Sequence, residues 1–219
     1  MIGSGEFISA VPASVARQLG DAVHLWRMPH ARGIGRTPLL ALLAAYLDTD
    51  AAALELRNDE HGKPHAYVRG EPCRGLQFNW SHSGEWALIT MARNVVPGVD
   101  IEQARAGVKT LEIAQRFFAP EEMQAMAACA DAERDALFFR LWCAKEAVLK
   151  ALGRGLAFGL ERVAFARQGE GWQPSRFDAE AGNPADWQVL MLSPAPGCDG
   201  ALAWRGPPKA VRAFQIAAE

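Results

Sequence analysis

The chain has 219 residues and a formal net charge of −2, and 50% of its residues are hydrophobic and 22% are charged. This length suits one large domain or two small ones around a sizeable apolar core. The charge balance argues against a general nucleic-acid binder, which carries a strong basic excess. No apolar run reaches the length of a membrane span. We therefore expect neither a nucleic-acid nor a membrane partner.

The four cysteines are widely spaced, and no CxxC pair exists, so neither a zinc site nor a redox motif is indicated. Free thiols without a disulfide framework fit a reducing cytoplasm. The first residues lack the basic-then-apolar order of a signal peptide. Their Gly-Ser-Gly-Glu-Phe stretch resembles a cloning-derived leader, so residues 1–7 are set aside from the fold.

The first half of the chain is predicted to hold one helix followed by strands. A helix that is apolar nearly all round is expected over Thr37–Leu47, with Thr37 as its cap and Pro38 in its first turn. Residues 61–64 read as a turn. Strands are expected over 77–83 and 85–93, as a hairpin around Gly84, and over 95–102, interrupted by Pro97-Gly98.

The second half is predicted to hold helices and then short strands. Helices are expected over 110–118, from Pro120 onward after a weak cap at Ala119, and from an Asp131 cap to about Leu152, before Gly153. Strand patterns follow at 162–166, 187–192, 200–205 and 209–217. This order predicts an α+β fold of two halves that meet near residues 101–108, divided here into 8–104 and 105–219.

Three carboxylates and a lysine are spaced so that they can meet. Asp100 and Glu102 stand two apart at the end of an apolar run, so on a strand they share one face while Ile101 turns into the core. Glu146 and Lys150 stand four apart and share one face of a helix. Such a set suggests a hard cation held beside phosphate oxygens. The plainer alternatives are surface charges at a strand end and a solvated helix face that includes Lys145.

A second polar cluster, Asn79-Trp80-Ser81-His82-Ser83, lies at the end of a predicted strand. His82 can carry positive charge beside a phosphate or act in proton transfer, although a lone His is more often structural. The G-x-S-x-G elbow of a hydrolase is absent. Gly153-Arg154-Gly155 does not follow a strand, so it is not a dinucleotide-binding loop.

Taken in order, these segments resemble the 4'-phosphopantetheinyl transferases, above all the larger, surfactin-synthetase-type branch. The matching blocks are Gly62-Lys63-Pro64, Phe78-Asn79-Trp80-Ser81-His82-Ser83-Gly84, Gly98-Val99-Asp100-Ile101-Glu102, Phe117-Phe118-Ala119-Pro120-Glu121-Glu122, and Trp142-x-x-Lys145-Glu146-Ala147-x-x-Lys150-x-x-Gly153-x-Gly155-Leu156. Together they cover roughly residues 36 to 165.

The resemblance implies a role for each matching residue. Asp100, Glu102 and Glu146 would hold Mg²⁺, or alternatively Mn²⁺, on the pyrophosphate of coenzyme A. His82 and Lys150 would contact the phosphates, and these two with Glu146 would be the catalytic residues. The nucleotide site would be lined by Arg57, Lys63, Pro64, Asn79, Trp80 and Ser81. Arg36 would reach the 3'-phosphate, with Arg27, His30 and Arg32 as the other basic candidates.

The implied reaction transfers the 4'-phosphopantetheine arm of coenzyme A to a serine of an apo acyl or peptidyl carrier protein and releases adenosine 3',5'-bisphosphate. The implied fold is a pseudo-two-fold monomer, with the nucleotide on the 8–104 half and the metal-binding helix and carrier docking on the 105–219 half. Carrier proteins are acidic, so we expect a basic or apolar docking surface. Its candidate residues are Arg116, Arg140, Met123 and Met126.

Two other functions stay open at this point: a coenzyme A or nucleotide-binding module whose catalysis has decayed, and a metal-dependent phosphoesterase. A decayed module has no physical need to keep all three carboxylates. A two-metal phosphoesterase usually needs more His and Asp ligands than a chain with five scattered histidines offers. The pathway of the carrier protein (fatty acid, polyketide or nonribosomal peptide) is not specified by the sequence.

Overall fold

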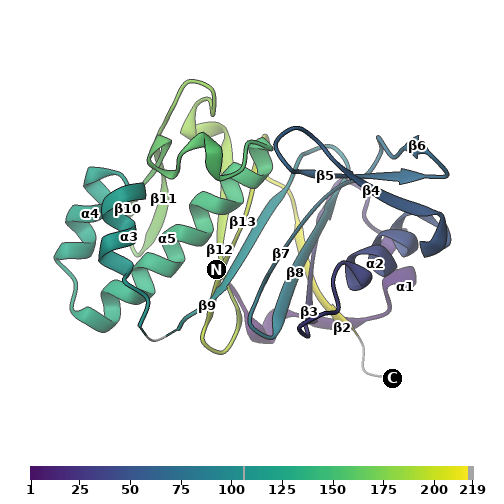
Figure 1. The fold of residues 1–219 in the computed structure, drawn as a ribbon, viewed down its shortest axis with the longest axis horizontal. Helices are drawn as coiled ribbons and strands as arrows, with labels where there is room; N and C mark the ends of the chain where they lie inside the picture. The colour runs from purple at the N-terminus through teal and green to yellow at the C-terminus, as the bar shows by residue number, and fades with distance from the viewer. Residues whose placement is uncertain (106, 217–219) are drawn as a thin grey trace.

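The computed structural model describes residues 1–105 and 107–216, without the side chain of residue 132. The fold is α+β, as the sequence predicts. Two sheets lie side by side in the middle of an elongated molecule, with helices at both ends (Figure 1). The five-stranded sheet has the order β2 (Ile8–Ala10), β14 (Val211–Ile216), β3 (Val23–Pro29), β8 (Trp86–Ala92) and β7 (Gln77–Ser83). The four-stranded sheet has the order β1 (Ile2–Gly3), β12 (Trp187–Ala195), β13 (Cys198–Arg205) and β9 (Gly98–Gln103).

Each sheet buries one face against a helix and the other face against the opposite sheet. Helix α2 (Thr37–Leu47) packs its leucines against Trp26, Phe78 and Ile89 of the five-stranded sheet. Helix α5 (Asp131–Leu152) covers the outer face of the four-stranded sheet. Residues such as Leu25 and Ile101 fill the space between the sheets. This layering places the edge strands β7 and β9 next to each other, with α5 above β9.

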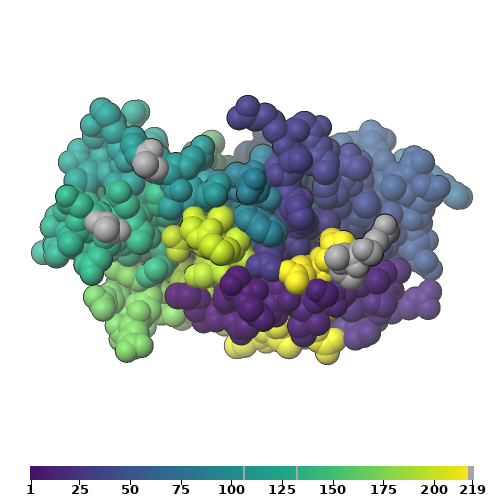
Figure 2. All heavy atoms as spheres, turned by 90° about the horizontal axis from the view of Figure 1, so that it is seen from below, coloured from purple at the N-terminus to yellow at the C-terminus, as the bar shows by residue number. Residues whose placement is uncertain are grey.

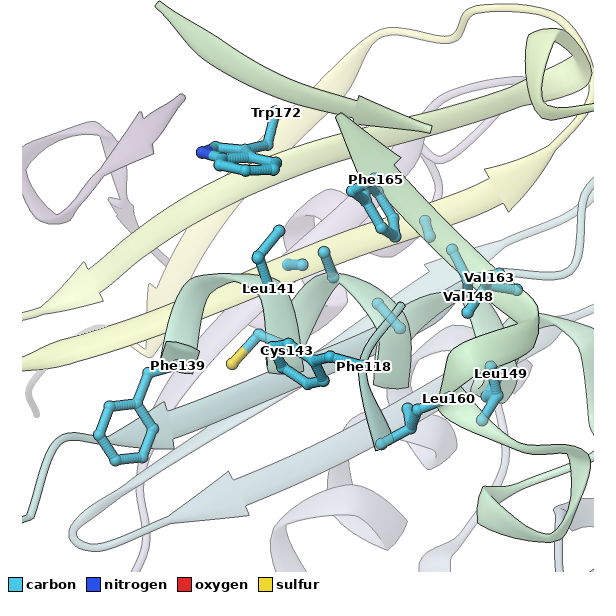
Figure 3. Close-up of a cluster of buried hydrophobic side chains, with 14 of the residues drawn as sticks. Phe118, Phe139, Leu141, Cys143, Val148, Leu149, Leu160, Val163, Phe165 and Trp172 are labelled. Atoms are coloured by element: carbon cyan, nitrogen blue, oxygen red, sulfur yellow. The ribbon is translucent and has the colours of Figure 1, made fainter. Parts of the chain in front are cut away.

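From Leu137 onward helix α5 is largely buried, because it is enclosed on more than one side. The hairpin of β10 (Val163–Gln168) and β11 (Gly171–Phe177) packs on it, together with α3 (Thr110–Phe117) and α4 (Pro120–Ala127). Figure 3 shows Leu141 of α5 near Trp172 and Phe165 of the hairpin, whereas Val148 lies beside Val163 and Leu149 lies near Leu160. None of the helices in the described part of the chain is long and apolar enough to cross a membrane.

The remaining elements are small. A three-stranded sheet of β4 (Leu54–Asn58), β5 (Pro64–Val68) and β6 (Glu71–Pro72) lies beside the end of the five-stranded sheet, and α1 (Pro12–Ala16) packs on α2. Short 3₁₀ turns span Ser4–Glu6, Ala51–Ala53, Leu156–Phe158, Leu160–Arg162 and Pro184–Asp186.

Most predicted elements are confirmed, but two predicted caps are wrong. Helix α2 spans the predicted residues, yet its N-cap is Arg36, and Thr37 is already helical. Likewise the N-cap of α5 is Ala130, without a capping side chain, while the Asp131 carboxylate accepts a hydrogen bond from Arg134. Helix α5 ends, as predicted, at Gly153, whose φ of 74° lies in the left-handed region that favours glycine. The predicted last strand is present over Val211–Ile216, and its residue 217 lies outside the described residues.

Setting residues 1–7 aside from the fold was wrong. Ile2 and Gly3 form a parallel pair with Leu192 and Ser193 of β12, and Phe7 is buried. In Figure 2 this purple N-terminal segment lies on the surface beside the yellow C-terminal strands. The guanidinium of Arg27, on β3, donates hydrogen bonds to the backbone oxygens of Ser4 and Pro194, so it joins the segment to both sheets.

The predicted boundary between residues 104 and 105 does not separate the strands of one sheet from those of the other. Strand β9 precedes that boundary but pairs with β13 in the four-stranded sheet. Strand β14, at the C-terminus, returns to the five-stranded sheet between β2 and β3. The four-stranded sheet therefore takes β1 and β9 from the first half of the chain, and the five-stranded sheet takes β14 from the second half. The pseudo-two-fold relation of the halves stays a prediction.

Candidate active site

The site lies along the seam where the edge strands β7 and β9 meet. Asn79, Ser81 and Ser83 alternate along β7, so they point to the same side of the strand. The Asn79 side-chain oxygen accepts the Val99 backbone N–H at 3.1 Å, and the Ser83 hydroxyl accepts the Gln103 N–H at 3.1 Å. Side-chain oxygens of β7 thus satisfy backbone donors of β9 and hold the two sheets in register at this edge.

Asp100 and Lys150 form the centre of the site. The Lys150 ammonium, from α5, donates to the Asp100 carboxylate at 2.6 Å and to the Ser81 hydroxyl at 3.0 Å, and Ser81 itself donates to Asp100 at 2.7 Å. Burial lowers the pKa of Lys150, but the carboxylates of Asp100 and Glu146 outweigh burial and raise it. Lys150 is therefore a fixed positive charge at this seam.

Two further carboxylates lie beside Asp100. Burial raises the pKa of Glu146 to about 7, and the charges of Asp100 and Glu102 add to the rise while Lys150 opposes it. Burial also raises the pKa of Glu102, partly offset by the hydrogen bond that the Ser83 hydroxyl donates to it at 2.7 Å. Glu146 is only 8% exposed, so the solvated helix face considered as the plainer alternative is wrong.

Three carboxylates face the ammonium of Lys150 and the guanidinium of Arg105, which lies 3.7 Å from Glu102, so negative groups outnumber positive ones and the donor set favours an additional cation. Asp100 Oδ2 is buried and makes no hydrogen bond within the described residues. An unpartnered carboxylate oxygen in such surroundings is costly unless a cation or another donor reaches it. Within residues 1–105 and 107–216, however, no three His, Cys, Asp or Glu side chains stand close enough together to hold a metal ion. Asp100, Glu102 and Glu146 fit Mg²⁺ by chemistry, but they do not converge on one point in this structure.

A cleft of about 210 Å³ opens next to Lys150, and we call it the basic cleft. The turn before β5, strand β7 and the end of α5 supply its walls. Lys63 reaches across it and donates to the Lys150 backbone oxygen at 3.2 Å. Burial lowers the pKa of Lys63 to about 8, with Asp59 partly offsetting the effect. The lining residues are Arg36, His61, Gly62, Lys63, Pro64, Asn79, Trp80, Lys150, Gly153 and Gly155.

His82 stacks on His30 of the neighbouring loop, with ring centroids 4.2 Å apart, and lies beside Trp80 at 5.1 Å. Burial lowers the pKa of His82, and the nearby His30 and Lys150 lower it further. The stack lies within range of the charge of Lys150, although neither imidazole lines the basic cleft. It brings His30, one of the N-terminal basic candidates, into the site region.

Other predicted residues lie elsewhere. Arg57 is not among the residues that line the basic cleft, because its guanidinium pairs with Glu55 at 2.8 Å and stacks on Tyr67. Arg27 is committed to the N-terminal segment, over the Phe7 ring, which leaves it unsuited to a phosphate contact. Met126 is fully buried, so its prediction as a docking residue is wrong.

Sequence reasoning missed two features that position the site, a buried ion pair and a glycine. Glu122 forms a fully buried ion pair with Lys145 at 2.7 Å, which ties α4 to α5. A lysine within the apolar run of α5 is the signal that could have revealed it, since such a charge needs a buried partner. The glycine is Gly98. A Cβ at this position would overlap the backbone of Ala147 and Ala151. This glycine lets α5 approach β9 closely enough to bring Lys150 to Asp100.

Comparison with known proteins identifies the family of the chain. The family model of the 4'-phosphopantetheinyl transferase superfamily matches residues 97–200, which include β9 and α5. The chain is 30% identical over 222 residues to the 4'-phosphopantetheinyl transferase HetI of Nostoc sp., covering 86% of this chain and 90% of that protein.

Two relatives from Bacillus subtilis match over a shorter range. A 4'-phosphopantetheinyl transferase is 31% identical over 65% of this chain and 60% of its own length, and the transferase Sfp is 30% identical over 60% and 56%. The chain spans little more than half of these two proteins, whereas it spans nearly all of the Nostoc relative. The chain therefore belongs to the 4'-phosphopantetheinyl transferase superfamily, in the branch that includes the Sfp-like enzymes.

Proposed function

We propose that this protein transfers the 4'-phosphopantetheine arm of coenzyme A to a serine of an apo acyl or peptidyl carrier protein, in a reaction that depends on Mg²⁺. The observation that carries the proposal is the cluster of Asp100, Lys150 and Ser81, with Glu146 beside it, at the mouth of the basic cleft. Carboxylates that would bind a cation, next to a cationic cleft, suit a pyrophosphate.

The chain's own residues bind and orient the phosphates. Lys63, Arg36 and Lys150 line the cleft and supply positive charge to the nucleotide phosphates. His82, stacked on His30 next to Trp80 of the cleft wall, would contact the phosphates from beside the cleft. Asp100, Glu102 and Glu146 would hold Mg²⁺ or Mn²⁺, which neutralises charge on the pyrophosphate when bound. Phosphoryl transfer needs this positioning and neutralisation more than covalent catalysis.

The serine oxygen forms a bond to the β-phosphorus, and the bond from that phosphorus to the bridging oxygen breaks. Adenosine 3',5'-bisphosphate leaves with the bridging oxygen. The serine proton goes to Glu146, directly or through water, because a carboxylate whose pKa is about 7 is suited to accept a proton near neutral pH. Glu146 as base and Glu146 as metal ligand are competing roles, and the second would require its ionised form throughout.

The carrier serine would approach along a groove of about 140 Å³ beside Glu102, walled by apolar residues such as Phe138 and Trp142. Arg105 borders this groove, and exposed Arg116 lies next to the half-exposed Phe117. A basic rim around an apolar floor complements an acidic carrier protein. We infer that one chain is sufficient, because the turn before β5, strand β7 and the end of α5 of a single molecule supply the walls of the basic cleft.

Intact-mass spectrometry of an apo carrier protein tests the proposal. The carrier is incubated with this protein, coenzyme A and Mg²⁺, beside a control that contains EDTA. A mass gain of one phosphopantetheine arm, abolished by EDTA, is expected. No gain across several carriers, with coenzyme A still bound, would instead indicate the non-catalytic binding module.

A further inference from the structure

One wall of the basic cleft is the turn of residues 59–63 between β4 and β5. Asn58 and Pro64 form the last pair of the β4–β5 ladder, so the turn projects from a fixed base. His61, Gly62, Lys63 and Pro64 all line the cleft. The turn is largely exposed to solvent and contains a glycine with φ of 84°, so backbone sterics alone do not hold its shape.

Asp59 holds this turn together from inside. Its side-chain Oδ1 accepts the backbone N–H groups of His61 and Lys63, both at 2.9 Å. Its backbone N–H donates to the Lys63 oxygen at 2.9 Å, and its backbone oxygen accepts the Gly62 N–H at 3.0 Å. Its Oδ2 is hydrogen-bonded to His65 Nε2 at 3.1 Å. One side chain therefore fixes both residues that flank Gly62.

The far side of the turn is fixed by Lys63 itself. Its ammonium donates to the Lys150 oxygen at the end of α5, which uses one of its three N–H donors and leaves two for an anion in the cleft. The position of that ammonium depends on the backbone of Lys63, and Asp59 accepts the N–H of the same residue.

We propose that Asp59 is a positioning residue of the coenzyme A site: it holds the 59–63 turn so that Lys63 and His61 face the phosphates of the bound nucleotide. This inference rests on the proposed function, since coenzyme A is taken as the ligand of the cleft. Asp59 does not touch the reacting atoms, so its effect falls on binding and not on the transfer step.

The negative charge of Asp59 disfavours binding of a phosphate ligand, whereas its hydrogen bonds to the turn favour it. These two effects can be separated by experiment. A carboxylate near a phosphate site repels the ligand. If Asp59 acted through charge, removing the charge would strengthen or leave unchanged the binding of coenzyme A. If it acts through its hydrogen bonds, Asp59→Asn keeps an acceptor oxygen for the two N–H groups, whereas Asp59→Ala removes it.

The experiment compares Asp59→Ala, Asp59→Asn and the control Glu60→Ala. Glu60 lies in the same turn, and among the described residues its exposed carboxylate makes only a 3.8 Å contact with His61. The assays are run at about pH 6.5, so that Lys63 stays protonated in every variant. We expect Asp59→Ala to raise KM for coenzyme A about tenfold with kcat within about twofold, which corresponds to the loss of one or two hydrogen bonds. Asp59→Asn and Glu60→Ala should stay within about twofold of the parent in both constants.

A second measurement needs no ligand. Hydrogen exchange of the His61 and Lys63 amides, followed by NMR, should accelerate in Asp59→Ala and stay slow in Asp59→Asn. Unchanged exchange in Asp59→Ala, an unchanged or lower KM in that variant, or an equal loss in Asp59→Asn would each overturn the assignment. If the parent protein neither binds coenzyme A nor transfers its arm, the proposed function fails, while the exchange result still decides whether Asp59 holds the turn.

Discussion

The buried ion pair of Lys145 and Glu122 gives a prediction that can be worked from the structure. The Lys145 ammonium lies 2.7 Å from the Glu122 carboxylate, and both side chains have no exposed surface. Lys145 uses its remaining donors on the backbone oxygens of Leu160 and Val163, at 2.9 and 2.6 Å. Removing Lys145 leaves a buried carboxylate without its counter-charge, and we predict that Lys145→Met lowers the free energy of unfolding by about 3–5 kcal/mol.

The Glu122 carboxylate of the pair also has other hydrogen-bond partners within the protein. Glu122 accepts the backbone N–H groups of Ala119 and Phe165, both at 2.8 Å. Glu122→Gln keeps an oxygen acceptor but presents N–H donors to the ammonium of Lys145, so it should cost a similar amount. In the double variant no buried charge is left unpaired. Its loss should therefore be smaller than the sum of the single losses by about 2 kcal/mol.

Urea unfolding followed by circular dichroism measures all three variants, with a constant m-value as the check on two-state behaviour. Lys109→Met is the matched control, because Lys109 pairs with Glu112 at 3.0 Å on the surface, where both side chains are mostly exposed. It should change stability by less than about 0.5 kcal/mol. Single losses below about 1 kcal/mol at the buried pair, or additivity within about 0.5 kcal/mol, would refute the reasoning.

Three further predictions follow from other contacts. Gly98→Ala places a Cβ against the backbone of α5 and should lower the free energy of unfolding by about 1–3 kcal/mol, as measured by thermal melts. In the control Gly75→Ala no atom lies closer than 3.8 Å to the new Cβ, so stability should not change. Equal melting temperatures of the two variants would contradict this prediction. Burial lowers the pKa of His24 to about 4, so between pH 6.5 and 4 the unfolded state binds one proton more than the folded state. The free energy of unfolding should therefore fall by about 3 kcal/mol as the pH drops from 6.5 to 4. The variant His24→Phe should lose this pH dependence, and an unchanged pH profile in it would refute the prediction. The pKa of about 7 at Glu146 implies that affinity for Mg²⁺, measured by calorimetry with coenzyme A present, weakens about tenfold for each pH unit below 7, and Glu146→Gln should remove that dependence.

The meeting of Asp100 with Lys150 was predictable because the residues are spaced by regular secondary structure. A two-residue spacing on β9 and a four-residue spacing on α5 each define a face, and those two faces meet at the 2.6 Å contact of Asp100 with Lys150. Ile101 is fully buried between the sheets, as its place between two carboxylates predicted. Local periodicity carries this information without any knowledge of the tertiary fold.

What could not be predicted depends on contacts between distant parts of the chain. Nothing in Ile2-Gly3 indicates that it pairs with Leu192 and Ser193, and the hydropathy of β14 does not reveal that it inserts between β2 and β3. Arg27 looked like a phosphate ligand because it is basic and lies before α2. Its actual partners, Ser4 and Pro194, come from opposite ends of the chain.

Lys145 and Glu146 illustrate how the pattern of one helix was misjudged. The solvated-face alternative grouped Lys145 with Glu146 and Lys150, although neighbouring residues on a helix point about 100° apart. In α5 that angle directs Lys145 and Glu146 toward different parts of the protein. Lys145 turns into the protein and anchors the helix to α4 and β10, and Glu146 faces the carboxylates of β9. The rotation of α5 about its axis is thus set by the buried pair, and the same rotation determines where Glu146 and Lys150 stand against Asp100.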